Sequence, residues 1–399
     1  MSRRDLLRLG AGVCMVGAAP TLRAAAALIR RPYLQNVRSD GASILWTTTE
    51  SGSGSVLVGR PDGSVFTVAA SVRAFPTSET KLTYPFFQYQ ADLTGLEPGV
   101  EYAYRIKQNG ATLTAAAGTF RTAAPGPFSF AVFGDTGEDT PAQRAIISRI
   151  GSEPGLSFLM HTGDLAYPQG TFERLDAVYF GLNSPLFERL PVFPTPGNHD
   201  YYADSAAPYV ASHALPDNGV NPADRNRYYS YDWGEAHFTS VDTNLLSGPA
   251  ADRMLAWLEN DLRSTRQFWK IVFMHHPPYP TGHHSGDAIC AIVRARMTDI
   301  VERWGVQLVI SGHEHGYERT LPLSDTQPTD AAVGTTYVIT GGGGATLHDS
   351  NGGGNTIVAL SEYNYLRVDV DGRTLNLRAI GMDGRELDRF FARHGYRPN

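Results

Sequence analysis

Five short segments between residues 134 and 315 carry the kinds of side chain from which proteins build metal sites. They are Gly134–Gly137, Gly163–Tyr167, Gly197–Asp200, Met274–Pro277 and Gly312–His315. Four of them open with a glycine, which permits the tight turns that aim neighbouring side chains at one point. Their aspartate, asparagine and tyrosine oxygens suit hard cations, and their histidine nitrogens suit zinc and iron. The chemistry indicated is therefore that of bound metal ions.

The segments contain enough candidate ligands for two ions. These candidates are Asp135, Asp164, Tyr167, Asn198, His275, His313 and His315. Two metal ions need about six to eight ligand atoms from the protein, and a carboxylate usually bridges them at a separation of about 3.5–4 Å. Glu314, between two of the histidines, is expected to point away from the metals. His276 is either structural or placed behind the ligands.

Each segment follows an apolar run that predicts a buried strand. The runs are Phe128–Phe133, Leu156–Met160, Pro191–Thr195, Lys270–Met274 and Val306–Ile310. Helical patterns lie between them at about residues 142–150, 172–182, 251–262 and 288–304, and the second is predicted to stop before Pro185. An α/β fold collects the carboxyl ends of its strands at a sheet edge, where ligands bind. We therefore predict that the five segments meet at one sheet edge.

The chain before these segments has a different character. Short alternating strands separated by turn residues fill residues 28–124 and predict a β-sandwich. Leu93–Ile106 resembles an element of fibronectin type III modules. No cluster of titratable residues occurs there, and the Ala123–Pro127 stretch is typical of a linker. The predicted class is α+β, with an N-terminal β-sandwich followed by an α/β domain over residues 127–399.

The composition indicates a folded, mildly acidic protein. Of the 399 residues, 42% are hydrophobic and 19% are charged, so a sizeable core can form. The formal net charge is −6 and there is no basic stripe, which argues against nucleic acid or an anionic membrane as the main partner. Cys290 lies in an apolar helical pattern and is predicted to be buried and structural.

The N-terminus is typical of an export signal. Arg3-Arg4 precedes a mild apolar run and the small residues Ala24–Ala27, the pattern of a twin-arginine (Tat) signal peptide over residues 1–27. The apolar run is shorter than the about 20 residues that span a bilayer, so no stable membrane anchor is expected. Cleavage would leave a periplasmic or secreted protein with Cys290 as its single cysteine and no internal disulfide. The alternative is an arginine-bearing N-terminal helix.

The five segments, in this order, resemble those of the metallophosphoesterases and, within them, the purple acid phosphatases. The Arg31–Asn36 start and the β-sandwich are also similar to that family, so the resemblance covers nearly the whole chain after the signal. Ordinary metallophosphoesterases begin with Asp-x-His. Here Gly137 replaces that histidine and Tyr167 follows Asp164 by three residues, a pairing that purple acid phosphatases have. The resemblance implies an α/β sandwich with mixed sheets and a phosphoester hydrolase.

The resemblance also implies a role for each ligand. Asp135, Tyr167 and His315 would hold Fe(III), with the tyrosine as a coloured phenolate. Asn198, His275 and His313 would hold one divalent ion (Zn, Mn or Fe), and Asp164 would bridge the two ions. A plain packing role for Tyr167 is the main alternative. The cysteines of disulfide-linked dimers are missing, so the oligomeric state stays open, with a monomer among the possibilities.

The implied reaction is hydrolysis of small phosphate monoesters in an acidic medium. A trivalent ion lowers the pKa of bound water, so that hydroxide can attack phosphorus in line. The leaving group needs a proton donor, for which His199 and the pair His283 and His284 are candidates. Two alternatives stand beside this interpretation. One is a phosphodiesterase or nucleotide hydrolase with two Mn or Zn ions, and the other is an adhesion module with a vestigial metal domain.

Overall fold

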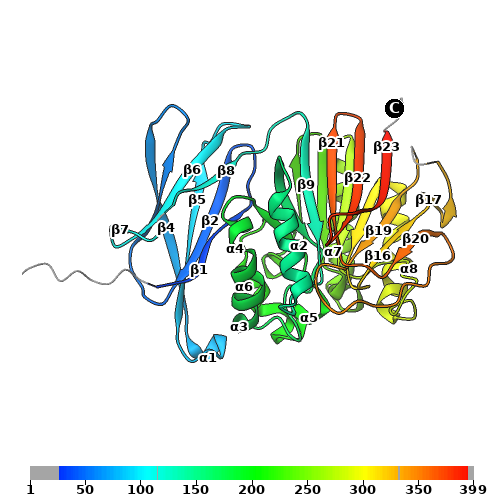
Figure 1. Ribbon diagram of the computed structural model, residues 1–399, viewed down its shortest axis with the longest axis horizontal. Helices are drawn as coiled ribbons and strands as arrows, with labels where there is room; N and C mark the ends of the chain where they lie inside the picture. Colours follow the sequence, from blue (N-terminus) through cyan, green and yellow to red (C-terminus); the bar gives the residue numbers. More distant parts are fainter. Residues whose placement is uncertain (1–26, 115, 331–332, 394–399) are drawn as a thin grey trace, which may run out of the picture.

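The computed structural model describes residues 27–114, 116–330 and 333–393. In Figure 1 a β-rich domain in blue and cyan lies beside a larger domain that contains helices and further sheets. The predicted signal, residues 1–27, lies outside the described residues except for Ala27. No helix within the described ranges is long and apolar enough to cross a membrane.

The first domain is a β-sandwich, as predicted. Its strands are β1 (Leu28–Gln35), β2 (Gly41–Thr48), β3 (Gly54–Gly59), β4 (Val65–Phe75), β5 (Phe86–Thr94), β6 (Glu101–Gln108), β7 (Ala111–Thr112) and β8 (Gly118–Arg121). They pair in the order β1-β2-β5-β4-β3-β6-β7, and β8 adds to β6. Residues 71–75 of β4 pair with β5 and residues 65–70 pair with β3. The sheet therefore folds over at β4 and encloses a core that includes Trp46, Tyr102 and Ile106.

The second domain contains two mixed sheets. The first consists of β9 (Phe128–Phe133), β10 (Leu156–His161), β11 (Val192–Pro194), β21 (Asn364–Asp371), β22 (Thr374–Gly381) and β23 (Glu386–Arg393). The second consists of β12 (Tyr229–Trp233), β13 (Ala236–Val241), β14 (Trp269–Met274), β15 (Leu308–Ser311), β16 (Tyr317–Thr320), β19 (Thr336–Thr340) and β20 (Thr356–Leu360). Their orders are β11-β10-β9-β21-β22-β23 and β12-β13-β14-β15-β19-β16-β20, with β17 (Leu323–Ser324) and β18 (Gln327–Pro328) as a separate hairpin.

The two sheets pack face to face around aromatic side chains. Phe130 and Phe158 of the first sheet each meet Phe238 of the second, with ring centroids 5.3 Å apart. Helices α7 (Ala251–Ser264) and α8 (Ala288–Arg303) pack on the second sheet, where Val293 joins a core cluster with Val272. Helix α2 (Pro141–Ser152) lies against the first sheet (Figure 1). The predicted α/β sandwich with mixed sheets is confirmed.

The expectation of a single sheet edge is wrong. Strands β9, β10 and β11 belong to the first sheet, whereas β14 and β15 belong to the second. The five metal-site segments follow these strands, so the site lies between two sheet edges. An apolar run shows that a strand is buried on both faces, but it does not show which sheet the strand joins.

The helical region after Thr171 also differs from expectation. Helix α3 (Phe172–Arg174), a π-helical segment (Leu175–Gly181) and α4 (Leu182–Phe187) follow one another, so the helical run passes through Pro185. Proline has no N–H to donate to the carbonyl four residues earlier. The hydroxyl of Ser184 donates to that carbonyl, of Gly181, at 3.0 Å. The missing backbone bond is thereby replaced.

Short helical turns complete the second domain, and β1 joins it to the first. The turns are α5 (Asn198–Tyr201), α6 (Ala207–Ser212) and the 3-10 segments Asp204–Ala206, Pro222–Asp224 and Thr243–Ser247, while α1 (Thr77–Thr80) lies in the first domain. The buried Arg30 pairs with Asp176 of the π-helical segment. The Gln35 side chain donates to the Val192 carbonyl at 3.1 Å, so β1 supports the strand that leads into Gly197–Asp200.

Candidate metal centre

Three of the candidate ligands leave their strands in an uncommon backbone conformation. Asp135, Asp164 and His313 have φ angles of 56°, 53° and 69°, in the left-handed region that few residues other than glycine adopt. Such conformations persist only where surrounding contacts enforce them, and they gather at functional sites. One such contact crosses the sheets, because the His313 N–H donates to Asp135 Oδ1 at 3.1 Å. The loops that follow strands of the two sheets therefore bring Asp135, Asp164 and His313 together between the sheets.

We call Asp135, Asp164, Tyr167 and His315 the oxygen-rich half of the site. The Tyr167 hydroxyl lies 3.2 Å from Asp135 Oδ1, 3.0 Å from Asp164 Oδ2 and 3.1 Å from His315 Nε2. His315 Nδ1 donates to the Thr346 carbonyl at 2.7 Å. This second contact fixes the ring and leaves Nε2 facing the carboxylates, the usual arrangement of a metal-binding histidine.

Negative charge is concentrated in the oxygen-rich half. Burial raises the pKa of Asp135 well above its usual range, and the Asp164 carboxylate adds to the shift. Burial is the largest single effect and would raise the pKa of Asp164, but His275, His199 and His313 together lower it below its usual range. Burial and both carboxylates raise the pKa of Tyr167 well above 10. The ion pairs of these two carboxylates among the described residues are with histidines, which are charged only when protonated. A bound cation would balance the negative charge that remains.

Gly137 explains why a tyrosine completes this half. A Cβ at position 137 would lie 2.1 Å from the Ala166 Cα, so no side chain fits there. The loop uses this close approach, because the Tyr167 N–H donates to the Gly137 carbonyl at 3.0 Å. The Arg174 guanidinium donates to the same carbonyl at 3.0 Å. The glycine therefore lets the tyrosine loop dock beside Asp135 and excludes a histidine ligand at position 137.

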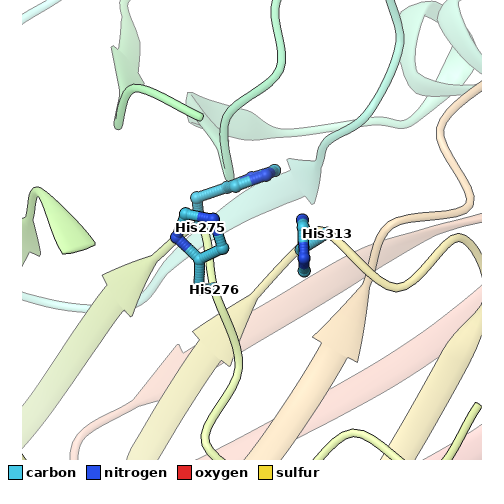
Figure 2. A group of neighbouring side chains, drawn as sticks. All are labelled: His275, His276 and His313. Carbon is cyan, nitrogen blue, oxygen red and sulfur yellow. The ribbon is translucent and has the colours of Figure 1, made fainter. Parts of the chain in front are cut away.

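We call Asn198, His275 and His313 the imidazole-rich half of the site. His275 Nδ1 donates to the Thr162 carbonyl at 2.9 Å, and its Nε2 lies 2.9 Å from Asn198 Oδ1 and 3.4 Å from Asp164 Oδ2. Burial disfavours the charged ring, but Asp164, Asp135 and the Thr162 carbonyl together raise the pKa of His275 to about 9. Figure 2 shows His275 and His313 at the ends of neighbouring strands, with His276 beside them. Asp164 thus touches both halves.

Comparison with protein families identifies the class. Residues 128–317 match the calcineurin-like phosphoesterase family, and residues 30–122 match the purple acid phosphatase N-terminal domain. The chain joins a purple acid phosphatase N-terminal domain to a calcineurin-like phosphoesterase domain. The family that the five segments resemble is therefore confirmed.

Two of the individual relatives are named as acid phosphatases. Acid phosphatase type 7 of Mus musculus is 25% identical, over 87% of this chain and 86% of its own length. An uncharacterised protein of Mycobacterium tuberculosis is 27% identical over 75% of this chain, which spans 66% of that relative, just under two thirds. Among solved structures, purple acid phosphatase PPD1 from yellow lupin (Lupinus luteus) seeds has a TM-score of 0.81 at 20% identity, covering 92% of this chain and 74% of that one. This last match shows that the fold is shared.

The residues of the phosphoesterase domain fit the dinuclear metal centre that its purple acid phosphatase relatives imply. Ligand atoms of Asp135, Asp164 and His275 lie within 4.8 Å of one another, close enough to surround metal ions. In the oxygen-rich half the Tyr167 hydroxyl donates its proton toward two buried carboxylates. A metal cation in place of that proton would balance more of their negative charge. The donor chemistry also differs between the halves, since carboxylate and phenol oxygens favour hard ions and imidazoles favour zinc and iron.

His276 supports the ligands from behind. Its Nδ1 bonds the Thr243 hydroxyl at 2.7 Å, and its ring centroid lies 4.5 Å from that of His313 and 4.8 Å from that of His275. Burial and the neighbouring His275 lower the pKa of His276 well below its usual range. A neutral buried ring therefore backs both ligand histidines of the imidazole-rich half.

The three candidate proton donors lie at different depths. The His199 ring is 4.4 Å from that of Tyr167, and its Nε2 is 4.0 Å from Asp164 Oδ2. The His284 ring stacks on His313 at 3.8 Å. His283 is exposed and contacts His284, with ring centroids 4.8 Å apart. His199 and His284 thus contact candidate ligands directly, whereas His283 contacts His284 and is separated from the ligand His313 by that ring.

Three residues hold this rim of the site, and sequence reasoning missed two of them, His348 and Asp287. The buried Glu314 accepts the His284 N–H at 2.8 Å and bonds His348 Nδ1 at 3.1 Å. His348 stacks on His315 with ring centroids 4.0 Å apart and planes 10° apart. Asp287 bonds both His284 and His313. Glu314 had a signal in its place between two ligands, but Asp287 and His348 lie in segments with no recognisable motif.

Proposed function

We propose that this chain is an exported acid phosphatase that hydrolyses phosphate monoesters at a dinuclear metal centre. The observation that carries the proposal is the position of Asp164, 3.0 Å from the Tyr167 hydroxyl and 3.4 Å from His275 Nε2. A carboxylate shared by two donor clusters suits a bridge between ions about 3.5–4 Å apart. The names of the murine and lupin relatives support the same activity.

Fe(III) is proposed for Asp135, Tyr167 and His315, and a divalent ion (Zn, Mn or Fe) for Asn198, His275 and His313. The support is the contrast between hard anionic oxygens in one half and imidazoles in the other. When bound, the ions would lower the pKa of a coordinated water and neutralise charge on the phosphate. Asp164 would be shared by both ions, since its Oδ2 faces both Tyr167 and His275, while its Oδ1 accepts the His199 N–H at 2.8 Å.

The residues of the chain itself would then manage the leaving group. His199 Nδ1 bonds the Pro168 carbonyl at 2.7 Å, which fixes the ring and leaves Nε2 on the side of Asp164. His284 Nδ1 is held by Asp287 at 2.8 Å. Each imidazole is therefore oriented at the edge of the site, where it can hold a proton for the departing oxygen.

Metal reconstitution tests the proposed activity. The purified protein is stripped with a chelator, reloaded with iron and zinc, and assayed with p-nitrophenyl phosphate and bis(p-nitrophenyl) phosphate. We expect a visible absorption band and faster hydrolysis of the monoester. Full activity with two Mn or Zn ions and a preference for the diester would favour a phosphodiesterase. Hydrolysis of neither compound by fully loaded protein would refute a phosphatase.

Export is proposed from the paired Arg3 and Arg4 and the small residues Ala24–Ala27, which except for Ala27 lie outside the described residues. Residues 1–27 fused to a folded reporter should deliver it to the periplasm or the medium of a bacterial host. The fusion with Arg3→Lys and Arg4→Lys should stay in the cytoplasm, because the twin-arginine pathway reads the arginine pair. Equal export of both fusions would contradict the proposed route.

A further inference from the structure

A pocket of about 390 Å³ lies beside the candidate metal centre. It is lined by Tyr279, Thr281, Ser285, Arg294 and the Gly352–Gly354 loop, among others. The segment that leaves the ligand His275 forms one wall of this pocket and then reaches His284, which stacks on the ligand His313. The pocket and the metal centre therefore share a wall.

The pocket contains a guanidinium with unused donors. Arg294 is exposed on α8, its Nε donates to the Pro278 carbonyl at 2.9 Å, and its guanidinium carbon lies 5.4 Å from the Tyr279 ring centroid. These contacts hold the side chain against the pocket wall. Its two terminal nitrogens have no hydrogen-bond partner among residues 27–114, 116–330 and 333–393. A guanidinium presented in this way can bind a carboxylate or phosphate through two parallel hydrogen bonds.

Nearby acids form their contacts with other groups than Arg294. Among the described residues that line the pocket, Arg294 carries a charge and the others are neutral. Glu318 accepts from the Thr281 N–H at 2.9 Å and from the Ser350 hydroxyl at 3.0 Å. Asp287 bonds His284 and His313 at the metal centre. Neither carboxylate is paired with Arg294, so its guanidinium remains available to an anionic ligand.

The glycine loop keeps the opposite side of the pocket open. Gly352, Gly353 and Gly354 have φ angles of 66°, 121° and 59°, which glycine adopts without strain. A Cβ at Gly353 or Gly354 would meet nothing within 4 Å, so the glycines provide backbone conformation next to free space. The Gly352 N–H donates to the Thr281 hydroxyl at 3.1 Å, which ties the loop to the other wall.

We propose that this pocket is a subsite for a second anionic group on the leaving-group side of the substrate, bound by Arg294. The inference rests on the proposed phosphatase activity and names its substrate class: phosphate monoesters that also carry a carboxylate or a further phosphate. Asp287, which bonds His313, lies seven residues before Arg294, and seven residues extend about 10 Å along a helix. A phosphate monoester whose second anionic group lies about eight to ten bonds from the first can span this separation, since an extended chain advances roughly 1.2 Å per bond.

Three small substrates test the subsite. n-Octyl phosphate has no second anionic group, 8-(phosphonooxy)octanoate adds a carboxylate, and 1,8-octanediol bisphosphate adds a phosphate. We expect the metal-loaded wild type to show a higher kcat/KM for the last two, mainly through a lower KM. Arg294→Ala should reduce this preference by about 10- to 100-fold, the value of a hydrogen-bonded charge pair. Arg294→Lys keeps the positive charge but loses the two parallel N–H donors of the guanidinium, so it should retain part of the preference for the doubly anionic substrates.

The control variant is Arg296→Ala. Arg296 lies on the same helix but donates to the Leu246 carbonyl and pairs with Asp252, outside the pocket, so its removal should leave the preference unchanged. A loss confined to the carboxylate or the bisphosphate substrate identifies which anion the subsite binds. An unchanged preference in Arg294→Ala, or an equal loss for all three substrates, overturns the subsite. Turnover of p-nitrophenyl phosphate without any preference defeats the subsite alone, whereas no turnover of any substrate defeats the proposed activity.

Discussion

The two sheets of the phosphoesterase domain supply different chemistry to the candidate metal centre. Asp135, Asp164, Tyr167 and Asn198, which follow β9, β10 and β11 of the first sheet, are all oxygen donors. His275, His313 and His315, which follow β14 and β15 of the second sheet, are all nitrogen donors. One sheet therefore provides oxygens and the other provides imidazoles, and the site exists only where the two edges face each other.

The two halves of the site mix these donors in different proportions. The oxygen-rich half places two carboxyls and one imidazole around a phenol. The imidazole-rich half places one amide oxygen beside His275, whose ring centroid lies 5.1 Å from that of His313. The first arrangement favours an ion of higher charge and the second favours a softer divalent ion. Asp164 belongs to both, so the contrast between the halves can be tested by changing it and then by changing one half at a time.

Asp164→Asn should have the largest effect, because it removes the carboxylate common to both halves. We expect loss of both metal ions and a fall in kcat/KM of about 10³-fold or more, since removing even one electrostatic stabiliser typically costs about 10²–10³. Metal content per chain and the rate with p-nitrophenyl phosphate measure the two losses.

Asp139→Asn is the matched control for this change. Asp139 also has a left-handed backbone, with φ of 64°, but pairs with the exposed Arg144. The control should keep both ions and near-normal activity. An Asp164→Asn protein that retained two ions per chain would show that the halves do not share this carboxylate.

Tyr167→Phe should break the oxygen-rich half selectively. We expect loss of the visible absorption band of the iron-loaded protein and roughly a 10- to 100-fold lower activity, within the range found when the surroundings of a metal are disturbed. The divalent ion should remain, because no ligand of the imidazole-rich half is changed. Tyr84→Phe, at a tyrosine that is 40% exposed, is the control. An unchanged spectrum in Tyr167→Phe would rule out phenolate ligation.

Much of the contrast between the two halves could be predicted from the sequence. Each ligand follows an apolar run that predicts a strand, and the five segments themselves show which ligands are oxygen donors and which are imidazoles. The pairing of Gly137 with Tyr167 also had a local signal, and the structure adds its reason, the 2.1 Å approach to Ala166. The division of strands between two sheets could not be predicted, since burial looks the same in both. The rim residues Asp287 and His348 were missed because their positions depend on loop packing, which leaves no periodic pattern.

Proton release should also distinguish the halves. The pKa of Tyr167 lies well above 10 without metal, so its binding as phenolate releases a proton over the whole working range. The pKa of His275 is about 9, so this ligand releases about one proton at pH 7, about half a proton near pH 9 and progressively less above it. Metal affinity should therefore rise with pH in both halves, by about tenfold per unit for each proton released, and the rise should level off first in the imidazole-rich half.

Titration calorimetry in buffers of different ionisation enthalpy measures these protons, with Ga³⁺ as a redox-inert trivalent ion and Zn²⁺ as the divalent one. The Tyr167→Phe protein should release one proton fewer than the wild type with Ga³⁺ at both pH 7 and pH 9.5. Equal proton counts for the two proteins would mean that the phenol keeps its proton, and the oxygen-rich half would then lack its most distinctive ligand.

Glu314→Gln should have the smallest effect, and it should act on both halves equally. The Glu314 carboxylate bonds the backbone of His284, which stacks on His313, and the ring of His348, which stacks on His315. A glutamine keeps the size but loses the charge, so we expect a loss of activity of roughly tenfold, the value of a charged hydrogen bond, without loss of either ion. Glu362→Gln, at an exposed pair with Arg385, is the control.

The separate variants His348→Ala and His284→Ala then divide this effect. His348→Ala should shift the visible band, because it uncovers a ligand of the oxygen-rich half, whereas His284→Ala should leave the band in place. If Glu314→Gln shifts the band as strongly as His348→Ala, the carboxylate acts mainly on the oxygen-rich half. If it lowers activity with no spectral change, its support of His284 dominates, and the rim belongs functionally to the imidazole-rich half.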